Sequence, residues 1–217
     1  MGLLARFLGH PFVYEHVRPL AVGGVDMSHA YHRLDTGPDS VIIDIGCGTG
    51  DALKHLHHFE SYLGIDTDER AIAFASERWK SRPNVRFECR LCTPDDLRTV
   101  APTHVALIGL LHHLTDAEAT DVLGMLLESP RLVRAVTLDI VYLAGRPYNN
   151  LMARLDRGRY CRKPDAYADL AASAGLRIVD RYIARSHPTR GLVQYYVLEL
   201  TPGRDSGIGE HPSSASR

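Results

Sequence analysis

Residues 41–50, VIIDIGCGTG, place a run of apolar residues directly before three closely spaced glycines. An apolar run of this length indicates a strand that is buried on both faces, as in a parallel sheet covered by helices. Gly46, Gly48 and Gly50 allow positive φ angles and let a ligand lie against bare backbone. The stretch therefore predicts a strand, a tight turn and a helix start, with the turn as a candidate binding loop.

Two acids accompany this turn. Asp44 stands two residues before the first glycine, and the next strand-like run, YLGID, ends in Asp66. An acid at the tip of the second strand can accept hydrogen bonds from both hydroxyls of a ribose. The glycine spacing is G-x-G-x-G rather than G-x-G-x-x-G, so the turn does not imply the pyrophosphate cradle of dinucleotide-binding proteins.

Outward from this stretch, buried strands alternate with amphipathic helices. This order predicts an α/β fold: a Rossmann-like, seven-stranded, mostly parallel sheet with helices on both faces and an antiparallel hairpin at the C-terminal end. We expect a helical lead-in or lid over 1–39, the main domain over 40–200 with an insertion at 140–163, and a disordered tail over 201–217. Further strands are expected at 61–66, 84–89, 103–111, 131–142, 176–184 and 192–200, and helices at 51–59, 68–80, 94–100, 116–129 and 164–175.

Three stretches resemble the class I S-adenosylmethionine-dependent methyltransferases: VIIDIGCGTG, YLGIDTDERAIAFA and HVALIGLLHHLTD. The resemblance covers roughly residues 40–200 and implies S-adenosyl-L-methionine as cofactor. It implies that the glycine turn passes the methionine part, that Asp44 helps to hold the amino group, and that Asp66 binds the ribose. The cofactor-binding residues expected in this way are Asp44, Gly46, Cys47, Gly48, Gly50, Asp66, Thr67, Leu91, Cys92 and Gly109.

The chain departs from this family after the third strand. The family usually has a Gly-Asp-Ala-like stretch there, whose Asp meets the adenine amino group, whereas this chain has Arg90, Leu91 and Cys92. The adenine is then expected to rely on backbone groups and on apolar packing against Leu91 and Thr67.

His112 and His113 follow the fourth expected strand, which the resemblance places beside the methyl group. One of them is a candidate general base or acceptor-orienting residue, because imidazole titrates near neutral pH. A structural role in the turn before the next helix is the alternative. No acidic cluster at ligand spacing accompanies the pair in the sequence, so we expect no metal. Asp139, at the end of the fifth strand, is a third catalytic candidate that would orient an acceptor, with helix capping as its alternative.

The long segment after the fifth strand mixes arginines with tyrosines. Insertions at the carboxyl ends of strands are where open α/β sheets build binding sites. Guanidinium groups beside aromatic walls suit an anionic acceptor, and the alternatives are a solvated loop paired with Asp156 and Asp165, or contact with a nucleic-acid backbone. The substrate candidates are Tyr142, Tyr148, Asn150, Arg154, Arg157 and Arg159, with Tyr14 and Tyr31 from the lead-in.

Bulk composition restricts the function classes. The chain has 217 residues and a formal net charge of −1, so no global field selects nucleic acid or an anionic membrane. Its four cysteines include one C-x-x-C, Cys89 and Cys92, which is weak evidence for a metal site. We expect reduced thiols, a cytoplasmic location, no membrane span, and a monomer or homodimer.

These observations predict a methyltransferase that modifies a hydroxyl of a small metabolite, such as a sugar or a secondary-metabolite intermediate. An RNA methyltransferase is an alternative, although no NPPY-like motif follows the fourth strand. A non-catalytic scaffold that binds the cofactor is the alternative from another class.

Overall fold

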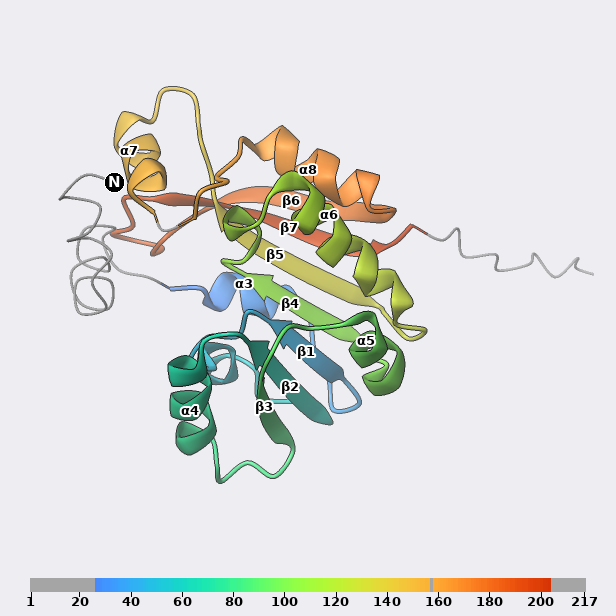
Figure 1. Ribbon diagram of the computed structural model, residues 1–217. Coiled ribbons are helices and arrows are strands. Elements are labelled where there is room, and N and C mark those ends of the chain that lie inside the picture. Colours follow the sequence, from blue (N-terminus) through green and yellow to red (C-terminus); the bar gives the residue numbers. More distant parts are fainter. Residues whose placement is uncertain (1–25, 157, 204–217) are drawn as a thin grey trace, which may run out of the picture.

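The computed structural model describes residues 26–156 and 158–203, and its centre is a seven-stranded sheet (Figure 1). The strand order is β3-β2-β1-β4-β5-β7-β6, and β7 runs antiparallel to both of its neighbours while the other pairs are parallel. The predicted fold class is confirmed. The strands are β1 (Val41–Ile45), β2 (Ser61–Asp66), β3 (Val85–Cys89), β4 (His104–Ile108), β5 (Arg134–Ile140), β6 (Leu176–Arg185) and β7 (Gln194–Pro202).

Strand β1 lies between β2 and β4, and all five of its residues are buried. The chain proceeds from β1 to β2 and β3 on one side and returns to β4 and β5 on the other. The carboxyl ends of β1 and β4 therefore flank the point where the strand order reverses, which is where open α/β sheets bind ligands. The glycine turn follows the end of β1, and the histidine pair follows the end of β4.

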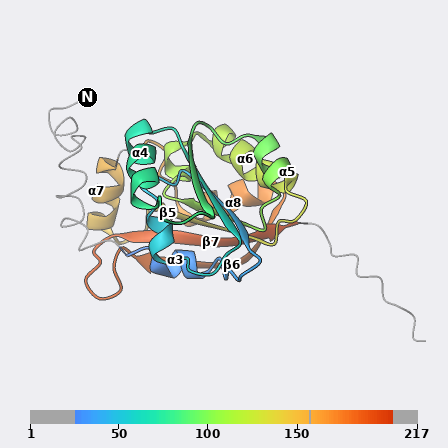
Figure 2. The same ribbon diagram turned by 90° about the horizontal axis from the view of Figure 1, so that it is seen from below.

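The helices form two layers. Apolar residues of α5, α6 and α8 pack with one face of the sheet, and those of α3 and η2 with the other. Figure 2 shows α3 opposite α5, α6 and α8, with α7 at one end of the sheet. The helices are α3 (Ser28–His32), η2 (Asp51–Lys54), α4 (Glu69–Arg78), α5 (Pro94–Val100), η3 (Leu111–His113), α6 (Asp116–Met125), η4 (Leu126–Glu128), α7 (Pro147–Leu155) and α8 (Pro164–Ser173).

The prediction of a helix over 51–59 was wrong in length, because only the 3-10 turn η2 forms there. Its N-cap is Gly50, which has no side chain to accept a hydrogen bond from the first turn. Three of the residues that follow are histidines, which have low helix propensity. The apolar residues of the segment still reach the core, since Leu53 and Leu56 are each 2% exposed.

The segment after β5 contains a helix, α7, that the sequence analysis did not assign. An isolated parallel bridge between Val141 and Arg162 joins the two ends of this segment and closes it into a loop at the carboxyl end of β5. Of the expected lead-in, α3 lies within the described residues. Residues 1–25 and most of the expected tail lie outside them. Within the described part of the chain, every helix falls short of the length and apolarity that a membrane span requires.

Candidate functional site

The glycine turn wraps over the end of β2. The backbone N–H groups of Gly46 and Cys47 donate to the carbonyl of Ile65, at 2.8 and 3.3 Å. Gly46, Gly48 and Gly50 all have positive φ, between 51 and 76°. A Cβ on Gly50 would lie 2.8 Å from the Phe87 ring, whereas a Cβ on Gly48 would meet no atom within 4 Å. The turn is therefore packed at Gly50 and open at Gly48.

Asp66 closes the turn from the tip of β2. Its Oδ2 accepts the N–H of Gly48 at 2.8 Å, and its Oδ1 accepts the N–H of Asp68 at 2.9 Å. Each carboxylate oxygen can accept a second hydrogen bond. Asp66 is only partly buried, so both oxygens retain capacity toward a ligand in front of Gly48.

Asp44 lies behind the turn and is 1% exposed. Its Oδ2 accepts the hydroxyl of Tyr62 at 2.6 Å, and among the described residues its buried Oδ1 has no hydrogen-bond partner. Burial raises the pKa of Asp44 to about 7 despite the hydrogen bond from Tyr62, and the charge of Asp66 adds to the rise. A buried carboxyl with an unused oxygen is suited to a cationic group such as an ammonium.

These features were tested against S-adenosylmethionine, the cofactor implied by the resemblance. The open face at Gly48 admits a ligand against the backbone, Asp66 offers acceptors for ribose hydroxyls, and Asp44 offers one for an ammonium. The residues of this turn fit the group in the chemistry of their donors and acceptors.

The loop after β3 lacks an acid at the expected adenine position. Leu91 is 73% exposed there, and Thr67 is exposed at the tip of β2. Arg90 turns to Asp96 instead, with two hydrogen bonds of 2.6 and 2.7 Å that lower the pKa of Asp96 to about 2. Cys92 is half-buried and packs against the core.

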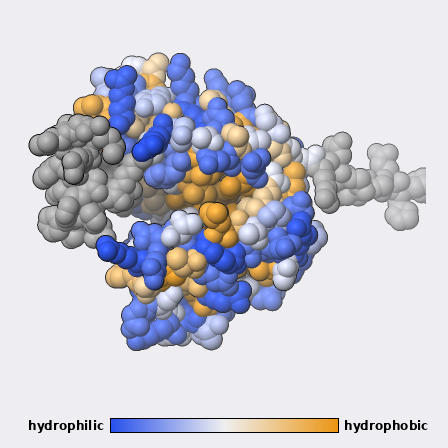
Figure 3. All heavy atoms as spheres, viewed as in Figure 1, coloured by the Kyte–Doolittle hydropathy of each residue, from blue (hydrophilic) through white to orange (hydrophobic). Residues whose placement is uncertain are grey.

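In Figure 3 apolar surface gathers near the middle of the face that is shown, between α6 above and α4 and α5 below.

The turn after β4 begins at Gly109, whose φ is 75° and whose N–H donates to the Leu138 carbonyl at 2.7 Å. It carries His112, whose side chain is 5% exposed. The ring Nδ1 lies 2.7 Å from Oδ1 of Asp139, which also accepts the His112 backbone N–H at 3.1 Å. The ring Nε2 lies 3.2 Å from Oδ1 of Asp156. His112 thus bridges two carboxylates from two different segments.

Burial alone lowers the pKa of His112, but the hydrogen bonds to Asp139 and Asp156 outweigh it and raise the pKa to about 9. At neutral pH the ring carries protons on both nitrogens, and both are engaged. This arrangement holds the turn to β5 and to the segment after α7 and leaves no free nitrogen to accept a proton. Asp139 is 1% exposed, and its Oδ1 accepts hydrogen bonds from the ring and the backbone of His112. His113 is exposed, with its ring centroid 4.2 Å from that of His112.

Arg162 fastens the same turn from the other end of the segment. Its guanidinium donates to the carbonyls of Leu111 and Leu114 at 2.8 and 2.7 Å, and to the carboxylate of Asp116 at 2.8 Å. It is 8% exposed. Arg162, one of the arginines of the basic segment, therefore has a structural role. Asp156 was expected to pair with the arginines of this segment, and it lies against the His112 ring.

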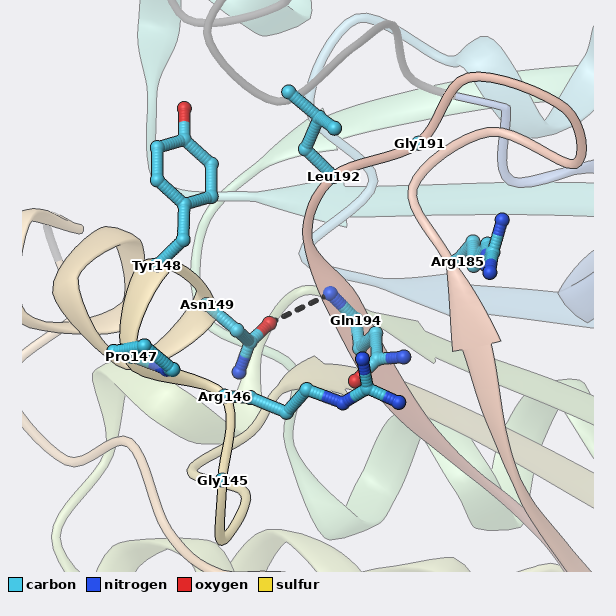
Figure 4. Close-up of a pocket in the computed structure, with 9 residues that line it drawn as sticks. All are labelled: Gly145, Arg146, Pro147, Tyr148, Asn149, Arg185, Gly191, Leu192 and Gln194. Atoms are coloured by element: carbon cyan, nitrogen blue, oxygen red, sulfur yellow. Dashed lines mark hydrogen bonds between the residues drawn. The ribbon is translucent and has the colours of Figure 1, made fainter.

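Two cavities border α7 at the carboxyl edge of the sheet. One, of about 660 Å³, is lined by Tyr142, Pro147, Asn150, Leu151 and Arg154. The other, of about 560 Å³, is lined by residues of α7 and of the β6–β7 turn (Figure 4). There Arg146 and Arg185 approach Gln194 from opposite sides, and Tyr148 extends from α7 near Leu192.

The other substrate candidates occupy different environments. Tyr31 is 7% exposed and stacks on His55, with ring centroids 5.7 Å apart. The Asn150 side chain accepts from and donates to the backbone of Leu143, at 2.9 Å each, so it braces the loop that the cavity borders. Arg159 is exposed. Tyr14 and Arg157 lie outside the described residues.

Three residues of the candidate site were not predicted from the sequence. Tyr62 meets Asp44 because the register of β1 and β2 sets Asp44 opposite Gly64, and a tyrosine within a strand run gives no separate signal. Asp156 meets His112 across 44 residues of chain, a separation that ligand-spacing patterns do not include. Arg185, at the C-terminal end of β6, lines the second cavity from the far side of Gln194, as Figure 4 shows, and its position depends on the pairing of β6 with β7.

Part of the chain is similar in sequence to known proteins. Residues 42–129 match the family model described as a methyltransferase domain. Over 116 residues the chain is 30% identical to the nonribosomal peptide synthetase kk1B of Curvularia clavata, a match that covers 49% of this chain and 1% of that protein. The matched part of the chain thus spans about a hundredth of the length of this curated relative.

Solved structures share the fold at low identity. The cyclopropane synthase MmaA2 of Mycobacterium tuberculosis has a TM-score of 0.64 and 12% identity, with 81% of this chain and 82% of that chain covered. Human N-acetylserotonin methyltransferase, solved with S-adenosylmethionine, has a TM-score of 0.62 and 15% identity, with 94% and 63% covered. Residues 42–129, which contain the glycine turn, are thus similar to a methyltransferase domain, and the chain shares the fold of these solved structures.

Proposed function

We propose that the protein transfers a methyl group from S-adenosylmethionine to a hydroxyl of an anionic small molecule, such as a sugar or secondary-metabolite intermediate. The observation that carries the cofactor part is the open backbone at Gly48, whose N–H donates to Asp66, together with the unpaired Oδ1 of the buried Asp44. When bound, the cofactor supplies an electrophilic methyl group on a sulfonium. The chain's own residues must hold that group and align an acceptor with it.

In this proposal the two acids divide the cofactor between them. The Asp66 carboxylate, already held by the Gly48 N–H, takes the ribose hydroxyls with its remaining lone pairs. The unpaired Oδ1 of Asp44 takes the ammonium of the methionine part, which favours the ionised carboxyl. Leu91 and Thr67, both exposed beside the turn, supply apolar and backbone contacts for the adenine.

Alignment of the acceptor falls to the segment around α7. In-line displacement depends chiefly on holding donor and acceptor in line at short range. His112 contributes by position, since its ring ties the turn after β4 to Asp139 and to Asp156, one residue beyond the C-terminal end of α7. Tyr142 and Arg154 line the cavity beside that helix and give it an aromatic wall and a positive charge.

The anionic character of the acceptor is supported by the arginines at both cavities. Arg154 borders the larger one, and Arg146 and Arg185 border the smaller one. A guanidinium group binds carboxylate or phosphate through paired hydrogen bonds, so a neutral acceptor would leave this charge unused. The flavin dimethyltransferase RosA of Streptomyces davawensis, 18% identical with a TM-score of 0.60 and with 93% of this chain and 62% of that one covered, shares the fold and acts on a small molecule.

The test measures S-adenosylhomocysteine release over a panel of hydroxylated acceptors in matched pairs, each acid or phosphate against its neutral ester or alcohol. We expect turnover with anionic members and at least a tenfold lower kcat/KM with neutral ones. Turnover confined to amines, or to added RNA, would contradict the proposal. Cofactor binding without turnover on any acceptor would favour the scaffold function.

A further inference from the structure

Three side chains with metal-ligand chemistry meet where the turn after β4 contacts the segment after α7. One ligand atom from each of His112, His113 and Asp156 lies within 4.8 Å of the others. The set combines two imidazoles and one carboxylate, which is a common donor set for zinc and other divalent transition metals.

The distance between the two buried ligands matches a bound ion. The Nε2 atom of His112 lies 3.2 Å from Oδ1 of Asp156. Two ligand atoms at tetrahedral positions on zinc, each at about 2.0–2.1 Å from the metal, are about 3.3 Å apart. An ion bound to both atoms would lie to one side of the line that joins them and would take the place of the proton that they share.

The His112 ring is also oriented as a metal-binding histidine is. Asp139 accepts from its Nδ1 at 2.7 Å, so Nε2 is the nitrogen directed at Asp156. A carboxylate on the far nitrogen of a ligating histidine fixes its tautomer and raises its basicity. Gly158 packs closely on the ring, since a Cβ there would be 2.1 Å from His112 Cδ2, so a larger residue at this position would displace the ring.

The charges around the ring favour a divalent ion over a proton. The carboxylates of Asp139 and Asp156 are 1% and 0% exposed, and Oδ2 of Asp139 has no hydrogen-bond partner in the described part of the chain. The nearby Arg162 is paired with Asp116 at 2.7 Å. Two carboxylates therefore lie against one imidazole ring, which is an environment that favours a bound cation.

We propose that His112, His113 and Asp156 bind a divalent transition metal of the zinc type, which fastens the segment after α7 to the turn after β4. Three protein ligands leave at least one coordination position for a water molecule or another ligand. Because Asp156 directly follows α7, the ion would also fix the helix that borders both cavities. The inference concerns metal binding and holds independently of the proposed methyl transfer.

The test titrates the chelator-treated full chain with Zn²⁺ alone, followed by calorimetry. We expect one site per chain with a micromolar or lower Kd, and at least a tenfold loss in both Asp156→Asn and His113→Gln. The chain supplies matched controls: the exposed adjacent pair His57→Gln/His58→Gln, and Cys89→Ser, which removes half of the C-x-x-C. Both controls should keep the affinity of the unchanged chain.

Co²⁺ in place of Zn²⁺ gives a second readout. We expect visible absorption of a low-coordinate site without thiolate charge-transfer bands, lost in His113→Gln, whose exposed ring can be replaced without opening the core. Absence of binding to the unchanged chain, equal affinity in Asp156→Asn and His113→Gln, or loss of the site in Cys89→Ser would each overturn the proposal. If Asp156→Asn does not fold, His113→Gln decides alone.

Discussion

Replacing Gly48 and Gly50 by alanine, one at a time, separates the packing of the glycine turn from its ligand-binding face. Both residues have left-handed backbone, with φ of 51 and 72°. An alanine in that region costs about 1–2 kcal/mol of folding free energy. At Gly50 the added Cβ would also lie 2.8 Å from the Phe87 ring and 3.0 Å from Trp79 Nε1, and overpacking of this kind costs about 1–3 kcal/mol more.

We therefore expect Gly50→Ala to lower the free energy of unfolding by about 2–5 kcal/mol and Gly48→Ala by about 1–2 kcal/mol. The order should reverse for cofactor affinity. The Cβ of Gly48→Ala enters the open space where the proposed ligand lies, so affinity for S-adenosylhomocysteine should fall at least tenfold, or about 1.4 kcal/mol.

Urea unfolding followed by the fluorescence of Trp79, the one tryptophan of the chain, gives the first quantity, and calorimetric titration gives the second. Gly37→Ala is the matched control, because Gly37 is equally open but precedes β1, away from the turn. Equal destabilisation by Gly48→Ala and Gly50→Ala, or unchanged affinity in Gly48→Ala, would refute the division of the turn into a packed and an open part.

Three further predictions follow from single side chains. Because the pKa of Asp44 is raised to about 7, the ionised fraction of its carboxyl grows about fivefold from pH 6 to 7, and affinity for the cofactor should rise by the same factor. Asp44→Asn should remove this pH dependence, and an affinity of the unchanged chain that does not vary with pH would contradict the prediction. Arg162→Met should cost about 2–4 kcal/mol in urea unfolding, through lost charge-assisted hydrogen bonds, and a loss below about 1 kcal/mol would show that the turn is held otherwise. Arg154→Gln should raise the KM of an anionic acceptor at least tenfold while the Kd of the cofactor stays constant. A change in the cofactor Kd instead would show that Arg154 contacts the cofactor and not the acceptor.

The sheet was predictable because its strands are long apolar runs bounded by turn residues. β1 and β2 were placed to within a residue, since Val41–Ile45 and Ser61–Asp66 are bounded by glycines and acids. The helix after the glycine turn was overextended, because spacing of Leu53 and Leu56 fits a full helix and a single 3-10 turn equally well. The periodicity of apolar residues does not show how far a helix extends when its first turn lacks a capping side chain.

The candidate site was predictable only where it is local in sequence. The glycine turn and Asp66 follow directly from the order of strand, turn and strand. The partner of His112 does not, because Asp156 is brought to it by the loop that closes at the bridge between Val141 and Arg162. Because of that single long-range contact, both ring nitrogens of His112 have carboxylate partners, and we propose that His112 acts as a positioning residue rather than as a base.

The proposed function requires that S-adenosylmethionine binds at the turn between Gly48 and Asp66. Calorimetric titration of the unchanged chain and of Asp66→Ala, both shown to be folded by their urea transitions, tests this binding most directly. We expect one site per chain in the unchanged protein and no detectable heat in Asp66→Ala. No binding to the unchanged chain, or full affinity in the variant, would contradict it.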